Sequence, residues 1–403
     1  MYMRQQRQIS EAQLECEYDK LMQGLSAEAS EGNSGEPVDD AYGQMLPEFL
    51  AKNPVAKNVV VDWLQHEPIT NLSYRKRVIR SAGRAVMIHE TIRYGEDFPS
   101  GFDDPDKWNT FANENWTSSD NHQFERWATH MNLPYNKNLH RRDVAAAAVA
   151  AAMQTRDGFS QKRPTVFRDW GAAAGLTLKA LELRRFSKVP VVGENEELDK
   201  TATALFDFLL HTARYGEGIG IDRLVPKTTE ELFHIKACTL SPSKLGTDSK
   251  PSAEEEEFDL LSMAQPQRTK LVKGDMLMLP NGLRKRLHTQ KGDIAMLNFV
   301  LGQNPGQTYE LVKAILPTIA EGGKLLITDY VEVDAQDPQK IHLRNRWEGD
   351  GWLCRTVSLD ADHPEAGFKT LFEYPDGNLD ILRFGKDIGS LGYPFKESGL
   401  VRQ

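Results

Sequence analysis

Hydrophobic spacing divides the chain into a helical first half and a mixed second half. From about residue 46 to 156, positions recur at helical intervals of three and four, as in Val78, Ala82, Ala85, His89 and Ile92. The run RRDVAAAAVAAAM is a strong helix former. No strand is expected in this half, so the pattern predicts a helical domain or cap over residues 46–156.

The N-terminal segment differs from this helical half. Residues 8–25 have the pattern of a short helix, and residues 24–40 are small, acidic and polar. That composition predicts a linker. We therefore expect residues 1–45 to be a flexible N-terminal segment.

After residue 160, short apolar runs alternate with helical segments. The predicted strands lie in TVFRDWG, VPVVGEN, GIGIDRL, KLVKGDMLMLP, DIAMLNFVLG and KLLITDYVEV. Such alternation is typical of a mostly parallel sheet with helices on both faces. The last apolar runs (WLCRTVSLD, FKTLFEY and LDILRFG) follow one another closely, with turn residues between them, which indicates antiparallel strands at the sheet edge. We expect one α/β domain over residues 157–403, with a solvated insertion near 230–268.

Composition limits the compartment and the partners. The formal net charge of −9 gives no general nucleic-acid footprint. No apolar window is long enough to span a membrane, and the N-terminus is too polar for a signal peptide. The three cysteines form no pair in sequence, and the ten histidines show no metal-ligand spacing. We expect a cytoplasmic protein without a metal site.

The stretch Asp169-Trp170-Gly171-Ala172-Ala173-Ala174-Gly175 is the first candidate for chemistry. Ligands of open α/β sheets bind at the carboxyl ends of the strands, and this stretch follows the first predicted strand. Small residues let the backbone approach a ligand, and the next helix offers free N–H groups. The alternative is an ordinary helix start whose small residues serve packing.

This stretch resembles the D/E-x-G-x-G-x-G motif of class I S-adenosylmethionine-dependent methyltransferases. Ala173 replaces the middle glycine, and alanine cannot take a positive φ cheaply. Later segments resemble the family in the same order. LVKGDMLMLP is similar to its G-D-x-x-x-L-P run, and KGDIAMLNFVLG through KLLITDYVE is similar to its fourth strand, helix and fifth strand.

The resemblance assigns roles to single residues. It implies a cofactor loop of Asp169, Gly171, Ala173 and Gly175. It also implies that Asp275 accepts a hydrogen bond from the adenine amino group and that Met276 lines the adenine pocket. Asn298 and Phe299 would face the methionine part of the cofactor and the acceptor.

The family also carries an acid after its second strand, which accepts hydrogen bonds from both ribose hydroxyls. Two residues compete for this role. Glu194 leaves room for one helix after the glycine-containing loop, whereas Asp222 requires an inserted segment. On spacing we prefer Glu194 and keep Asp222 as the alternative.

The resemblance implies a Rossmann-like fold with a seven-stranded, mostly parallel sheet, an antiparallel C-terminal edge and a helical region before it. It implies S-adenosylmethionine as methyl donor and in-line transfer to a small-molecule acceptor. Catalysis of that kind depends largely on positioning, with a base needed only if the nucleophile must lose a proton. No catalytic residue is assigned, and Asn298, Asp329 and Tyr330 are candidates.

Several alternatives stay open. The domain could be an inactive methyltransferase fold that serves as a scaffold, or it could methylate protein or RNA. The helical half could cap the pocket, select the acceptor or form a homodimer. A nicotinamide-dependent oxidoreductase should show G-x-G-x-x-G after the first strand, and this chain does not. The tetrapeptide NLPY (residues 132–135) follows a helix-like run, and we interpret it as a helix end.

Overall fold

The chain forms two compact units, Met1–Leu139 with Pro226–Leu260, and His140–Val225 with Leu261–Gln403. The computed structural model describes residues 10–31, 46–66, 72, 75–76, 78–79, 141–153, 164–186, 191–192, 196–223, 225–229, 231–232, 235–236, 253–298, 300–301, 308–329, 331–333, 341–343, 354–374 and 382–391. Among the helices of these residues, none combines the length and apolarity needed to cross a membrane.

In the first unit, helix α1 (Glu11–Glu31) packs against α3 (Pro54–His66). Ser10 and Gln13 form a capping box at the start of α1, because the Ser10 amide donates to Gln13 Oε1 at 3.0 Å and the Gln13 amide donates to Ser10 Oγ at 3.3 Å. The buried face of α1 consists of Leu14, Tyr18, Leu21 and Leu25. The short helix predicted within residues 8–25 is confirmed, but it continues to Glu31 into the predicted linker, and its buried face packs against α3 where a flexible segment was expected.

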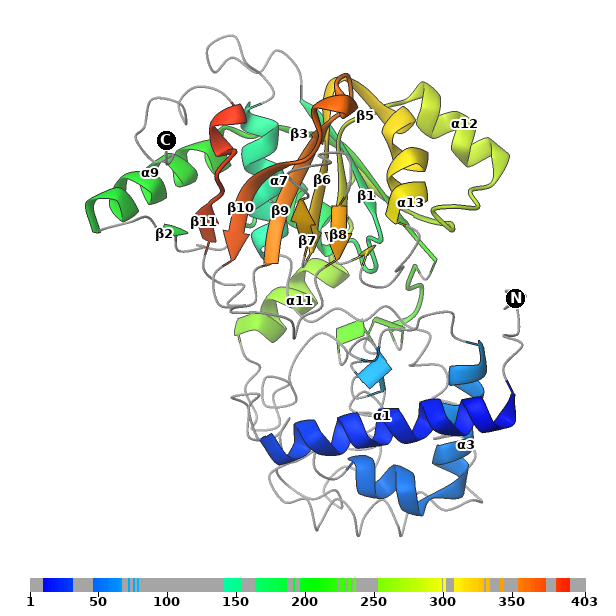
Figure 1. Ribbon diagram of the computed structural model, residues 1–403. Helices are drawn as coiled ribbons and strands as arrows, with labels where there is room; N and C mark the ends of the chain where they lie inside the picture. Colours follow the sequence, from blue (N-terminus) through cyan, green and yellow to red (C-terminus); the bar gives the residue numbers. More distant parts are fainter. Residues whose placement is uncertain are drawn as a thin grey trace. The chain divides into compact units, whose positions relative to one another are not determined.

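The second unit contains a nine-stranded sheet in the order β2-β11-β10-β9-β6-β5-β1-β3-β4 (Figure 1). Its strands are β1 (Thr165–Trp170), β2 (Val191–Val192), β3 (Tyr215–Asp222), β4 (Thr269–Lys273), β5 (Gly292–Asn298), β6 (Ile319–Asp329), β9 (Cys354–Asp360), β10 (Lys369–Tyr374) and β11 (Leu382–Phe384). A separate antiparallel pair joins β7 (Val331–Val333) to β8 (Ile341–Leu343).

Strands β4, β3, β1, β5 and β6 are parallel neighbours, and β9, β10 and β11 continue the sheet as an antiparallel meander. The prediction of an α/β fold with a mostly parallel sheet and an antiparallel C-terminal edge is confirmed. The predicted number of seven strands is wrong. The sheet extends past β10 through the three-residue β11 and the two-residue β2.

Helices cover both faces of the sheet (Figure 1). On one face, α7 (Arg141–Met153) packs against β5, α8 (Leu176–Leu183) and α9 (Glu196–Thr212). On the other lie α12 (Asn281–Thr289) and α13 (Thr308–Ile315). The described residues also form α11 (Ala253–Met263) and the 3-10 turns η4 (Leu316–Thr318), η5 (Pro364–Ala366) and η7 (Ile388–Leu391). Helix α7 belongs to this second unit, although the sequence grouped it with the helical half.

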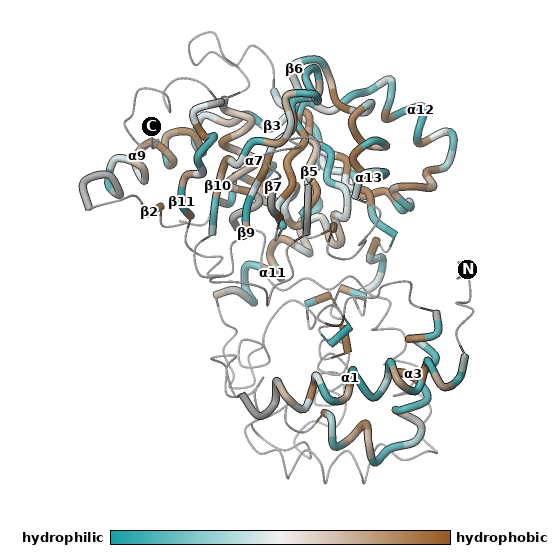
Figure 2. Tube along the Cα trace, in the orientation of Figure 1, coloured by the Kyte–Doolittle hydropathy of each residue, from teal (hydrophilic) through white to brown (hydrophobic). Residues whose placement is uncertain are grey.

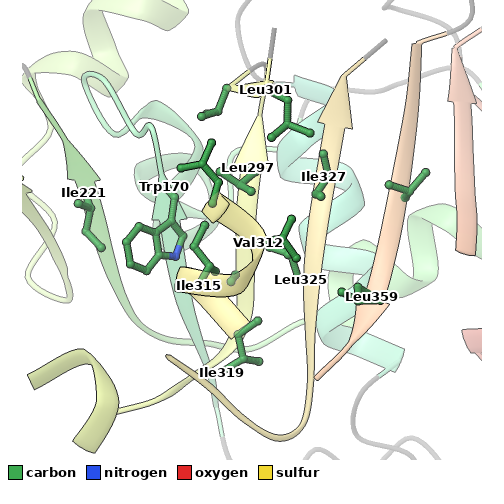
Figure 3. Packing of buried hydrophobic residues seen from close by; sticks show 14 of the residues in the cluster. Trp170, Ile221, Leu297, Leu301, Val312, Ile315, Ile319, Leu325, Ile327 and Leu359 are labelled. Carbon is green, nitrogen blue, oxygen red and sulfur yellow. The ribbon is translucent and has the colours of Figure 1, made fainter. Parts of the chain in front are cut away.

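A cluster of buried apolar side chains fills the α12/α13 face. Trp170 of β1 is fully buried in it, together with Leu297 of β5, Ile327 of β6 and Ile315 of α13. Figure 3 shows the Trp170 indole on the side of the sheet that α13 covers. Figure 2 shows apolar colour concentrated along the central strands, which matches strands buried on both faces.

The antiparallel edge carries a partly buried charge cluster. Asp360 of β9 accepts hydrogen bonds from Lys324 of β6 and from Lys369 of β10, the latter at 2.8 Å. Burial works to raise the pKa of the Asp360 carboxyl, but the hydrogen bonds and charges of the two lysines outweigh it and hold the pKa below its ordinary value. The carboxylate therefore stabilises the three-strand edge while it is ionised.

Replacing Asp360 with Asn should lower the free energy of unfolding at pH 7 by about 1–3 kcal/mol. A depressed carboxyl pKa stabilises the fold above the unfolded-state pKa, about 4, and that gain is lost as the pH falls through the folded-state value. The gap between wild type and Asp360→Asn in urea unfolding should therefore shrink below pH 4. Glu365→Gln, at a pair with His363 whose side chains are both mostly exposed, is the control and should show little or no gap, because solvent screens such a pair. A gap that stays constant between pH 7 and pH 3 would contradict this account.

Candidate functional site

The strand order reverses between β1 and β5. From β1 the chain builds outward through β3 to β4, and then returns to place β5 on the opposite side of β1. Ligands of open α/β sheets bind outside the carboxyl ends of the strands at such a switch point. Here that position lies between the Gly171–Gly175 loop after β1 and the segment that follows Asn298 of β5.

The loop after β1 has left-handed backbone at three positions. Gly171, Ala173 and Gly175 have φ angles of 91°, 47° and 70°. Gly175 caps the start of α8, and its carbonyl accepts the first helical hydrogen bond from the Lys179 amide at 3.0 Å. Ala173 pays about 1–2 kcal/mol for a conformation that glycine adopts freely. The stretch is therefore a strand, a tight turn and a helix, not one continuous helix.

The end of β3 holds this loop in place. The Gly171 amide donates to the Ile221 carbonyl at 2.8 Å, and the Ala173 amide donates to Asp222 Oδ2 at 2.8 Å. Asp222 is buried, and the hydrogen bond that it accepts from a backbone N–H offsets part of the cost of removing its carboxylate from water. The Asp222 carboxylate thus holds Ala173 in its left-handed conformation.

The topology supports Asp222 and not Glu194 as the acid after the strand beside β1. β3, which ends in Asp222, pairs directly with β1. β2, which precedes Glu194, lies at the far edge, and the antiparallel pairings between β6 and β11 make it run opposite to β1. The carboxyl end of β2 therefore points to the other end of the sheet. Spacing favoured Glu194 because a two-residue strand looked like the second strand of the fold.

The loop after β4 is tied to the same end of β3. The Gly274 amide donates to the Asp222 carbonyl at 2.8 Å. Asp275 is 9% exposed, and its Oδ1 accepts a hydrogen bond from the Leu277 amide at 2.8 Å. Its Oδ2 lies 3.3 Å from Nε of Arg223. Asp222 and Asp275 therefore follow neighbouring parallel strands and share one connected set of bonds.

The side chains of Met276, after β4, and Val300, after β5, lie next to Gly171. A Cβ at Gly171 would stand 2.5 Å from Val300 Cγ2 and 3.7 Å from Met276 Cε. Met276 was predicted to line the adenine pocket, and Val300 was not predicted at all. The loops after β1, β4 and β5 thus converge above the backbone of Gly171.

Strand alternation sorts the remaining candidates by face. Trp170, Ile221 and Leu297 belong to the cluster on the α12/α13 face. Their chain neighbours Asp169, Asp222 and Asn298 therefore lie on the α8 face, at the carboxyl ends of three neighbouring strands. By the same alternation from Ile327, Asp329 lies on the α12/α13 face. The structure brings the first three together and separates Asp329 from Asn298.

Asn298 has an unpaired donor at the switch point. Its Nδ2 atom is buried and has no hydrogen-bond partner within the described residues. Asn298 stands beside Thr328 in the sheet register, and a row of buried hydroxyls continues from Thr328 to Thr356 at 2.9 Å and on to Tyr374 at 3.0 Å. An orphaned buried donor costs stability unless something binds it. This amide is therefore a candidate donor to an acceptor atom of a ligand.

Three predicted residues, Glu194, Phe299 and Tyr330, lie outside the described part of the chain. Sequence reasoning missed Val300 and Arg223. A cation directly after a strand-end acid was the available signal for Arg223, whereas an apolar residue such as Val300 gave none. Within the described residues, no group of His, Cys, Asp or Glu side chains has the arrangement of a metal site.

Comparisons with known proteins yield distant structural matches. No family model and no curated protein matches the chain. The plantazolicin methyltransferase BamL, solved in complex with a triazolic desmethylPZN analog and SAH, matches at 13% identity, covering 65% of this chain and 60% of that one, with a TM-score of 0.24. An O-methyltransferase family protein from Burkholderia thailandensis matches at 9% identity, covering 64% and 55%, with a TM-score of 0.26. The pyocyanin biosynthetic protein PhzM matches at 12% identity, covering 81% and 79%, with a TM-score of 0.21. The chain thus spans under two thirds of the first two proteins.

Gly171→Ala should lower the free energy of unfolding by roughly 2–4 kcal/mol, because a left-handed φ and a clash with Val300 add together. Two other glycines separate the causes. Gly322 has a φ of 72° but open space around it, so Gly322→Ala should cost only about 1 kcal/mol. Gly282 has no left-handed φ, and an added Cβ would meet nothing within 4 Å. Gly282→Ala should therefore be neutral or stabilise the fold by up to about 1 kcal/mol. Urea unfolding of the three variants checks this order, and equal losses for Gly171→Ala and Gly282→Ala would overturn it.

Proposed function

We propose that the second unit is an S-adenosylmethionine-dependent methyltransferase acting on a small molecule. The observation that carries the proposal is the placement of two carboxylates, buried Asp222 and largely buried Asp275, at the ends of neighbouring parallel strands beside a left-handed loop at the switch point. A nucleoside offers two ribose hydroxyls and one adenine amino group as donors, and two carboxylates at consecutive strand ends supply acceptors for both.

The residues present fit such a cofactor. The left-handed loop from Gly171 to Gly175 carries only small residues, and the orphaned Nδ2 of Asn298 offers a buried donor. Asp222 would take the ribose, Asp275 the adenine amino group, and Asp169 and Asn298 would lie toward the methionine part. When bound, the cofactor supplies a methyl group on a sulfonium that is already a good leaving group. This chain's own contribution is then to hold donor and acceptor in line and to exclude water.

Asn298 is our candidate for orienting the acceptor or the cofactor, because its Nδ2 is a buried donor without a partner in the described residues and lies at a strand end on the α8 face. Asp329 lies on the other face of the sheet, so it is the weaker candidate for contact with the same ligand. Tyr330 and Phe299 keep the roles proposed from the sequence. A small-molecule acceptor suits a site in which positioning replaces a dedicated acid–base pair.

A second candidate is an inactive fold of the same class that serves as a scaffold. The bond between the Ala173 amide and Asp222 favours it, because loop and acid already satisfy each other without a ligand. Val300 also fills the space directly above Gly171. Both features would raise the free energy required for a cofactor to enter.

Calorimetric titration with S-adenosylhomocysteine tests the proposal. Wild type should bind, and Asp222→Asn should weaken binding at least about tenfold, because charged hydrogen bonds to the ribose hydroxyls are lost. Asparagine keeps an oxygen for the Ala173 amide, so the loop should stay folded. Glu194→Ala is the matched control and should change the affinity less than about twofold. If folded wild type does not bind S-adenosylhomocysteine, the proposal of an active enzyme is wrong and the scaffold proposal remains. If Glu194→Ala loses binding, Glu194 and not Asp222 is the acid that binds the ribose.

Asn298→Leu should separate stability from ligand binding. Removing an orphaned buried donor should leave the free energy of unfolding unchanged or raise it by up to about 1 kcal/mol. The same variant should bind S-adenosylhomocysteine or the acceptor more weakly, because a ligand then loses its donor. Asn281→Leu, at the exposed start of α12, is the control and should change neither. A destabilised Asn298→Leu that binds normally would show that the amide serves the fold.

A further inference from the structure

Helix α12 has one apolar side and one basic side. Leu283 and Leu287 pack against the apolar cluster of the sheet. The ionisable side chains of the helix are all exposed and all basic, and one more exposed lysine follows two residues after its end. We call these residues the α12 basic surface: Arg284, Lys285, Arg286, His288 and Lys291. Their side of the helix contributes nothing to the core.

The cations of this surface have no acidic partner in the fold. Within the described residues, the side chains of Arg284, Lys285 and Lys291 form no ion pair or hydrogen bond. The Arg286 side chain donates only to Gln290 Oε1, at 3.1 Å. Like charges at neighbouring positions of a helix repel one another. These charges therefore do not stabilise the fold, and they are available to an anionic partner.

The sequence around α12 differs in charge from the rest of the chain. Residues 269–292 contain six lysines and arginines and one acidic residue, so their net charge is +5. The single acid, Asp275, lies 3.3 Å from Nε of Arg223, outside α12. Because the whole chain carries −9, the other residues together carry −14. A locally positive surface on an acidic chain attracts anions to one place and not to the molecule as a whole.

The size of the surface favours a short acidic segment over an extended polyanion. The nine residues of α12 span about 14 Å. A nucleic acid or an anionic membrane extends well beyond that length. It would also meet the acidic remainder of the chain, whose repulsion acts over about 8 Å at physiological ionic strength. A protein segment about as long as α12 places its carboxylates on these cations alone.

An exposed apolar side chain adjoins the basic surface. Met278, three residues before the start of α12, is 72% exposed. Methionine and arginine are enriched in protein–protein interfaces. A phosphate backbone offers no apolar group to such a side chain, whereas a peptide does. Met278 therefore favours a protein partner with apolar residues among its carboxylates.

We propose that the α12 basic surface, together with Met278, docks an acidic segment of a partner protein that carries apolar residues between its carboxylates. The two arginines can pair with carboxylates through two parallel hydrogen bonds each, whereas the lysines act as point charges. Exposed ion pairs are individually weak, so the binding is salt-dependent and needs several of them together. The proposal does not rest on the proposed function, because no residue of this surface belongs to the candidate site.

The experiment is fluorescence anisotropy of the full chain with a labelled helical peptide of glutamate, leucine and alanine. Wild type should bind this peptide, and should not bind the same peptide with glutamine in place of glutamate. Arg284→Glu combined with Lys285→Glu should weaken binding at least about tenfold, because attractive pairs become repulsive. Neither side chain has a partner in the described part of the chain, so the double variant should unfold in urea like wild type.

A matched double variant separates a local effect from total charge. Arg185→Glu combined with Lys386→Glu changes the same charge at two exposed residues whose side chains have no partner among the described residues. Arg185 follows α8 on the other face of the sheet, and Lys386 follows β11. This variant should change the affinity less than about twofold. Met278→Ser should weaken binding of the leucine-containing peptide about threefold, and should not affect a peptide of glutamate and alanine alone.

Four results would overturn the proposal. The first is no binding of the acidic peptide at low salt, and the second is equal weakening in the two double variants. The third is tighter binding of single-stranded DNA or of phosphatidylserine vesicles, lost in Arg284→Glu/Lys285→Glu, which would identify a phosphate ligand. The fourth is self-association in sedimentation that this variant abolishes, which would make a second copy the occupant. None of these measurements involves S-adenosylhomocysteine, so their failure is distinct from failure of the proposed function.

Discussion

The site depends on the last two residues of β3. Ile221 accepts the Gly171 amide, and Asp222 accepts the Ala173 amide through its side chain and the Gly274 amide through its carbonyl. Through these bonds one strand end fixes the loops of both its neighbours, β1 and β4. Because the three strands are parallel and adjacent, their carboxyl ends meet, and the loop geometry follows from hydrogen bonds that the fold needs anyway.

The sheet explains why polar side chains gather at its end. Strand alternation assigns Trp170, Ile221 and Leu297 to the α12/α13 face, so the residues beside them face α8. Asp222 and Asn298 consequently share a face, on the two strands that flank β1. A shift of one residue in any of these strands would exchange a core side chain for a polar one, which makes the register costly to change.

Much of this arrangement was predictable from the sequence. Apolar runs separated by helical segments gave the α/β class, and the small-residue loop was found because a strand precedes it. The acid at the end of the strand beside β1 was not predictable, because Val191–Val192 and Tyr215–Asp222 both have the sequence pattern of strands. Only hydrogen-bond pairing decides which of them neighbours β1. A short helix over residues 8–25 was predicted, but its continuation to Glu31 was not, because the residues from 24 onward are small, acidic and polar. The pairing of Arg223 with Asp275 is a tertiary contact between two loops, and no periodicity encodes it.

Ala173 has a consequence for how loops of this shape are found in sequences. Asp222 holds this alanine in a left-handed conformation that glycine adopts more readily. The backbone path of the loop therefore does not require glycine at each of its left-handed positions. A sequence pattern that demands glycine at all of them passes over a loop with this geometry.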